Sequence, residues 1–503
     1  YLPPWAPFNI YQFSSWARAT IVPMLIILAR KPHCPVPPEA AIDELYPVSR
    51  VHTDYSLPRP HSLWGWRGFF YLTDKLLHVL EKTPWDPLQG PALRRAEQWI
   101  LAHQEADGSW GGIQPPWVYS LLALKTLGYG MDHPAMRKGF RGFEGFAIEE
   151  GDTWRVQACI APVWDTCLAA IALVASWLLK EQVLTGGDWQ VKARGIPPGG
   201  WSFEFHNDLY PDTDDSAEVI IALAQINVDD KGAQRCAVEL GVRWLLGIQS
   251  RNGGWGSFDK DNDKTYIARI PFADFGESID PPSVDVTAHI LEVLGRLGYR
   301  RNDAAVKRAL RYIKKEQEPE GCWFGRWGVN YVYGTGAVLP ALEAVGEKMT
   351  QPWVQRAAQW LVDHRNPDGG WGESCATYAD QSQKGVGPST ASQTAWALLA
   401  LLSAGWGSHA AVERGVRYLV ETQEGDGSWD EPYFTGTGFP GYGIGQRFKK
   451  APRAGEEPGL HPALPSGFMI NYHLYRVYWP LMALGRYKRF REGLPVIPRV
   501  GPG

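Results

Sequence analysis

The sequence lacks the features of several large protein classes. It has only six cysteines and no Cys-x-x-Cys pair, which predicts neither a zinc site nor a disulfide framework and favours a reducing compartment. The longest strongly apolar run, residues 168–179, is shorter than the ~20 residues that a membrane span needs. Because 50 basic side chains are balanced by 54 acidic ones, the clustered positive charge of a nucleic-acid-binding protein is absent as well.

What the sequence has instead is an apolar and strongly aromatic composition. Hydrophobic residues make up 45 % of the 503 positions and charged residues 21 %, which is typical of a globular protein with a large core. The chain holds 24 Trp, 21 Tyr and 18 Phe. This number of aromatic rings indicates a purpose beyond filling volume.

One pattern recurs along the chain: a basic amphipathic helix, a Gln, a polar turn that contains Gly, and a Trp. Tight copies run over residues 104–110, 249–255, 317–323 and 423–429, a fifth at 365–371 begins with Arg, and residues 182–189 are interpreted as a looser copy that ends in Trp189. Repeats of this kind are typical of stacked helical units. Because an amide and an indole can connect neighbouring helix ends, the repeat itself is predicted to be structural.

Helices that are polar on one face alternate with helices that are apolar throughout. The first kind is represented by residues 92–104. The apolar helices are predicted at residues 119–127, 165–179, 216–226, 286–297 and 392–404. The alternation predicts an all-α protein built as an α/α barrel, with the polar-faced helices outside. A non-catalytic helical scaffold is the alternative, since it also stacks helix pairs.

Three aspartates crowd the start of one apolar helix, in the segment Tyr-Pro-Asp-Thr-Asp-Asp-Ser-Ala-Glu at residues 210–218. Asp212 is predicted as the helix N-cap, and capping would explain a single aspartate there. Capping does not explain Asp214 and Asp215 as well, because like charges repel and burial also raises a carboxyl pKa. At least one carboxyl is therefore predicted to stay protonated, as a Brønsted acid that faces an apolar cavity.

A second apolar helix carries Asp285 and His289, which are four residues apart and share a helical face. A histidine on such a face is most often an ordinary core residue. Placed opposite the acidic motif, a charged imidazole could hydrogen-bond Asp214 and sharpen its acidity, with Asp285 orienting the ring.

The Asp-Thr-Asp-Asp motif at 212–215, together with the Gln-to-Trp repeats, resembles the squalene–hopene cyclases, the bacterial class II triterpene cyclases. Residues 9–20, 110–117, 161–166, 323–331 and 435–440 resemble the same family, so the likeness runs from Asn9 to about Arg486. It implies two α/α barrels with QW repeats. Residues 1–160 are expected to form a membrane-facing barrel that is partial, because the family's chains extend upstream of Tyr1, and residues 161–503 the catalytic barrel.

The resemblance implies an isomerase that protonates the terminal alkene of squalene and closes rings in one cationic cascade. The product would be hopene or, with hydro-lyase-type activity, hopanol, and no cofactor or metal would be needed. Asp214 would be the proton donor, Asp212 and Asp215 would support it, and His289 with Asp285 would be its partner pair. Gln114 and Pro115 match the positions where the family holds the water that ends the cascade.

The resemblance also implies an aromatic cavity, because π faces stabilise a cation by roughly 0.5 to 2 kcal/mol each. For each ring, ordinary core packing is the alternative. Phe258 stands where some members of the family carry a Tyr. The implied lining residues are Trp16, Trp164, Phe203, Phe258, Trp327, Phe439, Phe468, Tyr472 and Tyr475.

Related enzyme classes fit the sequence less well. Oxidosqualene cyclases carry a Cys where this chain has Asp215, and class II diterpene cyclases bind a diphosphate and have fewer repeats. A metal-dependent terpene synthase needs an Asp-Asp-x-x-Asp cluster, which is absent. A glycosidase needs two separated carboxylates in a polar cleft, and the predicted inner helices are too apolar to form one. A cyclase of another linear polyprene or diterpenoid remains the alternative among enzymes.

Squalene dissolves in bilayers, so the chain is expected to contact a membrane surface. The segment 61–72 combines Leu63, Trp64, Trp66, Phe69 and Phe70 with basic neighbours, as interfacial helices do. A buried core helix is the alternative. The resemblance implies a peripheral, monotopic protein on the cytoplasmic side of the cell membrane, and a homodimer would match the family.

Overall fold

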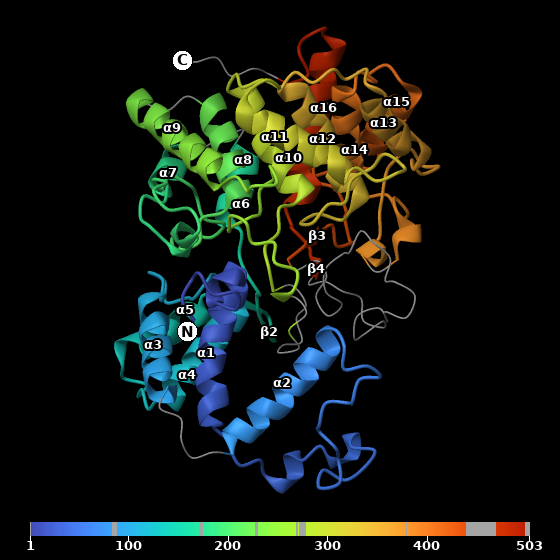
Figure 1. Ribbon diagram of the computed structural model, residues 1–503. Coiled ribbons are helices and arrows are strands. Elements are labelled where there is room, and N and C mark those ends of the chain that lie inside the picture. Colours follow the sequence, from blue (N-terminus) through green and yellow to red (C-terminus); the bar gives the residue numbers. More distant parts are fainter. Residues whose placement is uncertain are drawn as a thin grey trace. The chain divides into compact units, whose positions relative to one another are not determined.

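The computed structural model describes residues 2–82, 88–170, 175–226, 230–267, 270, 278–378, 380–438 and 469–497 (Figure 1). The chain divides into two compact units. The first is formed mainly by Arg18–Val156, and the second by Leu2–Ala17, Gln157–Ala268 and Asp274–Gly503. The predicted division into a partial barrel over 1–160 and a catalytic barrel over 161–503 stays a prediction.

The first unit is mostly helical and ends in a hairpin of two short strands. Proline starts two of its helices, where its missing N–H costs no hydrogen bond: Pro115 lies in the first turn of α4 and Pro134 begins α5. Its elements are α1 (Ser15–Arg30, which begins in the second unit), α2 (Trp66–Glu81), α3 (Gln89–Ala102), α4 (Gln114–Thr126), α5 (Pro134–Glu144), β1 (Ala147–Glu150) and β2 (Thr153–Val156), with β1 and β2 antiparallel.

The second unit is built around a ring of inner helices, each packed on the next in sequence order (Figure 1). The ring closes where the indole N–H of Trp164, in the first inner helix, donates a hydrogen bond of 3.1 Å to the hydroxyl of Tyr475 in the last. The inner helices are α6 (Pro162–Ala170), α8 (Thr213–Gln225), α10 (Val284–Arg296), α12 (Tyr331–Ala344), α14 (Ala391–Ser403) and α16 (Tyr475–Arg491).

Outer helices alternate with the inner ones and bury a single face. In α11, Val306, Ala309 and Ile313 are buried, while its last turn carries Lys314 and Lys315. By contrast every residue of α10 and of α14 is buried, so their polar side chains must find partners inside the protein. The outer helices are α7 (Ala175–Lys180), α9 (Lys231–Ile248), α11 (Ala304–Glu316), α13 (Pro352–Asp363) and α15 (Ala410–Glu421), and a pair of short strands, β3 (Gly436–Thr437) and β4 (Met469–Ile470), precedes α16.

The Gln-to-Trp repeats join the ends of neighbouring helices by hydrogen bonds. Gln249 donates from Nε2 to the carbonyl of Gly253 in its own turn (2.8 Å) and to that of Ala305 at the start of α11 (3.1 Å). The indole of Trp255 donates to Leu245 in the preceding helix at 2.7 Å. The other repeat indoles, those of Trp110, Trp323, Trp371 and Trp429, donate to the carbonyl ten residues earlier in the same way.

The glycine of the repeat is required by backbone conformation. Gly253 has a φ of +98° and Gly321 one of +112°, in the region that side chains with a Cβ rarely adopt. The repeat is therefore a structural connection, as its residue types predicted.

One assignment within the repeats was wrong. The copy that begins at Gln182 does not end at Trp189 but at Trp201, whose indole donates to Leu178 at 2.7 Å. Gln182 donates to Gly199 and to Ala237, which is the pattern of the tight copies with a longer turn. Trp189 occupies the inserted segment and packs edge-on against Trp244 instead. Spacing alone favoured the nearer tryptophan.

The predicted all-α fold is confirmed, and each predicted apolar helix overlaps a helix of the structure. Residues 165–179 contain α6 and α7, and residues 171–174 between them lie outside the described part. The sequence analysis did not single out α12 and α16 as inner helices. Both contain a proline, Pro340 and Pro480, which interrupts the pattern of a regular helix.

Candidate active site

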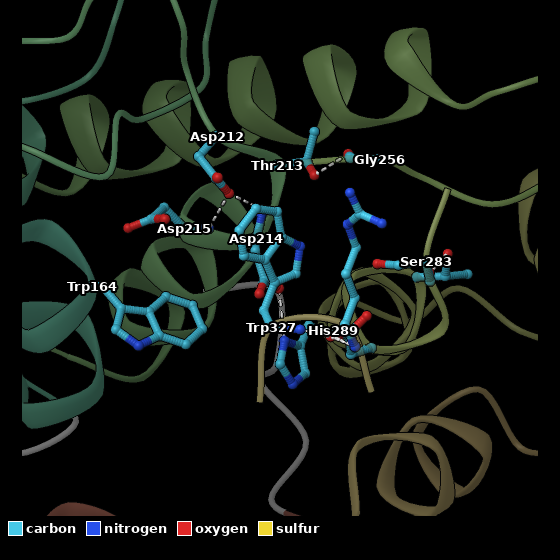
Figure 2. A network of polar contacts seen from close by, with 12 residues as sticks. Trp164, Asp212, Thr213, Asp214, Asp215, Gly256, Ser283, His289 and Trp327 are labelled. Carbon is cyan, nitrogen blue, oxygen red and sulfur yellow. Dashed lines mark hydrogen bonds and ion pairs between the residues drawn. The ribbon is translucent and has the colours of Figure 1, made fainter. Parts of the chain in front are cut away.

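The acidic motif forms the first turn of α8, where Asp212 acts as the N-cap. One oxygen of its carboxylate accepts from the backbone N–H groups of Asp214 (2.6 Å) and Asp215 (3.0 Å). These are N–H groups that a helix leaves without partners at its start, so the predicted cap is confirmed. Backbone hydrogen bonds thereby hold the Asp212 carboxylate in place. The carboxyl groups of Asp214 and Asp215 take no part in this cap (Figure 2).

A neighbouring turn holds the start of α8 in place. The N–H of Thr213 donates to the carbonyl of Ser257 and its hydroxyl to that of Gly256, both at 2.8 Å. This turn is itself organised by the carboxylate of Asp280, which accepts from the backbone N–H groups of Ser257, Phe258 and Asp259 at 3.1, 2.7 and 3.0 Å. Burial raises the pKa of Asp280 to about 6, although Arg326 opposes the change.

Asp214 meets His289 across the interface of two inner helices. Oδ1 of Asp214 lies 2.6 Å from Nδ1 of His289, and both side chains are buried, at 10 % and 6 % exposure (Figure 2). Burial disfavours a charge on the imidazole, but the Asp214 carboxylate outweighs this and raises the pKa of His289 to about 10. The ring is therefore an imidazolium at neutral pH, bound to one oxygen of Asp214.

The two flanking aspartates have strongly perturbed pKa values. Burial raises the pKa of Asp212 well above its usual value, and the neighbouring Asp214 carboxylate adds to the change. Burial, followed by the charges of Asp212 and Asp214, does the same for Asp215. One oxygen of Asp215 has no hydrogen-bond partner among the described residues. The motif therefore retains protons at a pH where an exposed aspartate has none.

Asp285 does not orient His289 by a hydrogen bond, contrary to the expectation from their spacing. Its carboxylate accepts instead from the backbone N–H groups of Arg326 and Trp327, each at 2.8 Å. Its negative charge still contributes to the raised pKa of His289. The spacing placed both side chains on one face of α10, but the partner of Asp285 comes from the turn that precedes α12.

The predicted cavity aromatics form two groups, and the first surrounds Trp16. Its indole packs edge-on against Phe258, with ring centroids 5.8 Å apart, and against Trp327 at 6.0 Å. Trp327 belongs to the turn that Asp285 holds. Three of the predicted rings, far apart in the sequence, are thus brought into one cluster.

The second group begins at the acid–histidine pair. The ring of Trp164 lies 6.3 Å from that of His289 and donates its indole hydrogen bond to Tyr475. Tyr475 stacks on Tyr472 with centroids 4.5 Å apart, and Tyr472 in turn meets Phe203 edge-on at 6.5 Å. The described aromatic rings therefore continue from the histidine to Phe203.

Sequence reasoning missed several residues that complete this second group. Tyr333 packs edge-on against His289 at 6.1 Å and against Trp396 at 4.7 Å. Trp396 continues to Tyr475 and Trp479. These rings come from α12, α14 and α16. For Tyr333 and Trp396 the available signal was an aromatic residue inside an apolar helix.

The other predicted site residues are not joined to this geometry. Phe439 and Phe468 lie outside the described residues. Gln114 and Pro115 form the start of α4 in the first unit, and their predicted role in termination stays a prediction.

The predicted membrane-contact residues lie at and just before the start of α2, also in the first unit. Leu63, Trp64, Trp66 and Phe69 are exposed, and Phe70 is half-buried. No helix in the described part of the chain is long and apolar enough to span a bilayer.

An α/α barrel whose inner helices present buried carboxyl groups, an imidazolium and a series of aromatic rings defines a class of enzymes, the class II terpene cyclases. Two family models match the chain: the squalene-hopene cyclase N-terminal domain over residues 1–152 and the squalene-hopene cyclase C-terminal domain over residues 160–448. The chain belongs to the squalene–hopene cyclase family.

Individual relatives agree with this assignment. The squalene–hopene cyclase of Alicyclobacillus acidocaldarius is 46 % identical over 97 % of this chain and 74 % of its own length. The squalene–hopene cyclase of Bradyrhizobium diazoefficiens is 37 % identical over 98 % of this chain and 73 % of its own. A dammaradiene synthase of the fern Dryopteris crassirhizoma is also 37 % identical, over 99 % of this chain and 74 % of its own length.

Proposed function

We propose that this enzyme protonates a terminal alkene of squalene and cyclises it to a pentacyclic hopanoid, with Asp214 as the proton donor. The family and the names of two relatives support squalene as the substrate. The observation that carries the proposal is the contact of 2.6 Å between Oδ1 of Asp214 and the His289 imidazolium, inside a ring of apolar helices. Alkenes are weak bases, so their protonation needs an acid strengthened in this way.

The imidazolium strengthens the acid because it stabilises the carboxylate that remains once the proton has left. An opposite charge within hydrogen-bond distance favours the charged form of a carboxyl group. The raised pKa values of Asp212 and Asp215 have a complementary effect, because burial and the neighbouring carboxyl groups disfavour further negative charge beside Asp214. Once Asp214 carries a proton, these surroundings favour its transfer to a substrate that offers only a π bond.

The aromatic rings would then stabilise the cations that follow. Trp164, Tyr475 and Tyr472 extend from the acid–histidine pair, and Trp16 with Trp327 forms a second surface. Aromatic faces attract cations without supplying a lone pair that would trap them. Termination by deprotonation gives hopene, whereas termination by water gives hopanol.

The test is an incubation of the detergent-solubilised enzyme with squalene in H2O and in D2O, beside Asp214→Asn. We expect pentacyclic products that carry a single carbon-bound deuterium when they form in D2O, because one proton starts each cascade. Asp214→Asn keeps the shape of the side chain but carries no acidic proton, so product formation should fall by at least three orders of magnitude. EDTA should leave the rate unchanged.

Asp426→Asn is the matched control, since Asp426 lies in an exposed turn of the last repeat. It should retain the activity of the unchanged enzyme. A folded Asp214→Asn variant with unchanged activity would refute Asp214 as the donor. A tetracyclic dammarane product would instead favour the chemistry named for the fern relative, and turnover of other polyprenes alone would refute squalene as the substrate.

We further propose that α2 and the residues just before it attach the enzyme to a bilayer surface. The proposal is supported by large apolar side chains that are each at least 40 % exposed, among them Trp64 at 94 %. Arg67 and Lys75 supply positive charge beside them, as in helices that lie in the interface of anionic membranes. The exposed apolar residues are Leu63, Trp64, Trp66, Phe69, Leu72, Leu76, Leu77, Val79 and Leu80.

Flotation with vesicles of phosphatidylcholine and phosphatidylglycerol tests this attachment. Burying an aromatic side chain is worth roughly 1.5 to 3 kcal/mol, so Trp64→Ser combined with Phe69→Ser should weaken binding at least tenfold. Trp154→Ser is the control, because Trp154 is an exposed aromatic residue too, at 60 %, but lies on β2 and not on α2. Equal losses in the two variants would contradict a specific role of α2.

A further inference from the structure

His289 lines a cavity inside the ring of inner helices, in addition to its contact with Asp214. The centres of water molecules can occupy ≈ 30 Å³ of it, which is room for about two waters. Its wall includes Glu218 of α8, Glu292 and Arg296 of α10, and Arg486 of α16. The wall therefore combines these charged side chains with apolar ones such as Leu399 and Met482. Water can occupy a cavity of this size where it finds several polar partners, as the charged side chains provide here.

Glu218 is the charged group in this wall that the proposed mechanism leaves unused. It lies one helical turn after Asp214 and on the same face of α8, since the two are four residues apart. It is 8 % exposed, and its carboxyl group makes no hydrogen bond or ion pair with any residue in the described ranges. A buried carboxyl group without a protein partner is costly unless it is protonated or bound to water.

The other charges around Glu218 already have partners. Glu292 accepts from Arg296 and from Arg486, at 2.6 and 2.9 Å. Burial raises the pKa of Glu218 to about 7, an effect that His289 partly opposes. The charged and titratable groups that face it are Asp214 on its own helix, His289, Glu292 and Arg296 on α10, Tyr333 on α12 and Arg486 on α16.

A turnover that gives the Asp214 proton to an alkene leaves a carboxylate, which must regain a proton before the next substrate can react. We propose that Glu218, which lines the cavity and lies one helical turn from Asp214, returns this proton to Asp214 through a water molecule between the two carboxyl groups. This inference rests on the proposed function. In one shift, the Glu218 carboxyl group gives its proton to a water and that water gives another to the Asp214 carboxylate. The water is unchanged, and Glu218, now a carboxylate, is reprotonated by solvent water that exchanges with the cavity.

The experiment compares one turnover with many. In Glu218→Gln the first turnover needs no returned proton, so with enzyme in excess over squalene the rate of product formation should stay within twofold of the unchanged enzyme. With squalene in excess, kcat should fall at least tenfold, because each later turnover waits for a proton. A second readout equilibrates the enzyme in D2O and then mixes it with squalene in H2O. Slower exchange in Glu218→Gln should give a product that carries several times more deuterium.

Glu343→Gln is the matched control. The charges of Arg296 and Arg486 act on Glu343 of α12 as well, but Glu343 does not line the cavity. The control substitution should change none of these quantities. Glu218→Asp retains a carboxyl group and leaves space for water, so its kcat should fall only two- to threefold with the single-turnover rate unchanged. This variant decides the question by itself if Glu218→Gln does not fold.

Two results would overturn the relay. One is an equal fall of kcat and of the single-turnover rate, which would mean that Glu218 shapes the site rather than recharging it. The other is an unchanged kcat with unchanged deuterium retention. If the unchanged enzyme makes no product from squalene even in a single turnover, the proposed function itself fails, and the relay fails with it.

Discussion

The buried carboxylate of Glu292 allows a quantitative prediction about stability. One of its oxygens accepts from Arg296 at 2.6 and 3.1 Å and from Arg486 at 2.9 Å. Burial alone would raise the pKa of Glu292, but the charges of Arg486 and Arg296 overcome it and lower the pKa from 4.5 to about 2. A glutamine has the shape of a protonated glutamate, so Glu292→Gln removes the stabilisation that this shift represents.

The size of the effect follows from the shift. At about 1.4 kcal/mol per pKa unit, a change from 4.5 to about 2 corresponds to roughly 3 kcal/mol. This agrees with the ~3 to 5 kcal/mol lost when one partner of a buried ion pair is removed. Because the folded-state pKa is the lower one, the contribution is fully present above pH 4.5 and is lost as the pH falls through about 2.

Urea unfolding of the detergent-solubilised protein at pH 7, followed by tryptophan fluorescence, measures this difference. Glu292→Gln should reduce the free energy of unfolding by about 3 kcal/mol. Glu343→Gln is the control: burial raises the pKa of Glu343 despite nearby arginines, so its charge does not stabilise the fold and its removal should cost less than ~1 kcal/mol. A loss below ~1 kcal/mol in Glu292→Gln, or equal losses in both variants, would refute the electrostatic argument.

Two further predictions concern the histidine and the repeats. The pKa of His289 is raised from 6.5 to about 10, so its stabilising contribution is complete below pH 6.5 and lost as the pH rises through about 10. The stability difference between the unchanged enzyme and His289→Asn should therefore shrink by roughly 1.4 kcal/mol per pH unit between pH 7 and 9, and a constant difference would contradict the assigned charge. Trp371→Phe removes a buried 2.6 Å hydrogen bond to a helix-end carbonyl and should cost ~1 to 3 kcal/mol in urea unfolding. Trp189→Phe should cost less, because the Trp189 indole N–H has no partner among the described residues.

Much of the fold could be predicted from the sequence because its determinants are local. The apolar helices and the amphipathic ones differ in composition over a single helix length, and Asp212 caps α8 through its own second and third neighbours. The glycine of the tight repeats, such as Gly253 or Gly321, is required by the backbone of its own turn. Such features depend on residues close in the sequence, so a single chain reveals them.

The errors have the opposite origin, because each involves a partner distant in the sequence. Trp201 rather than Trp189 closes the repeat at Gln182, since a segment of any length can loop out between two ends that hydrogen bonds fix. Asp285 faces the expected side of α10, yet its hydrogen bonds go to a turn more than forty residues away. A helical periodicity assigns a face to a side chain but not the element that covers that face.

By itself, the sequence determined the helical repeat, the crowded carboxyl groups at one helix start and the family to which they are similar. The tertiary structure decided which groups meet. It brings Asp214 to His289, 75 positions away, and it places Glu218 at the wall of a cavity and not beside a positively charged partner. The physical reason is that a carboxyl group's protonation and acidity depend on burial and on the charges within a few ångströms. Those neighbours come from different inner helices, and only their packing in a closed ring brings them together.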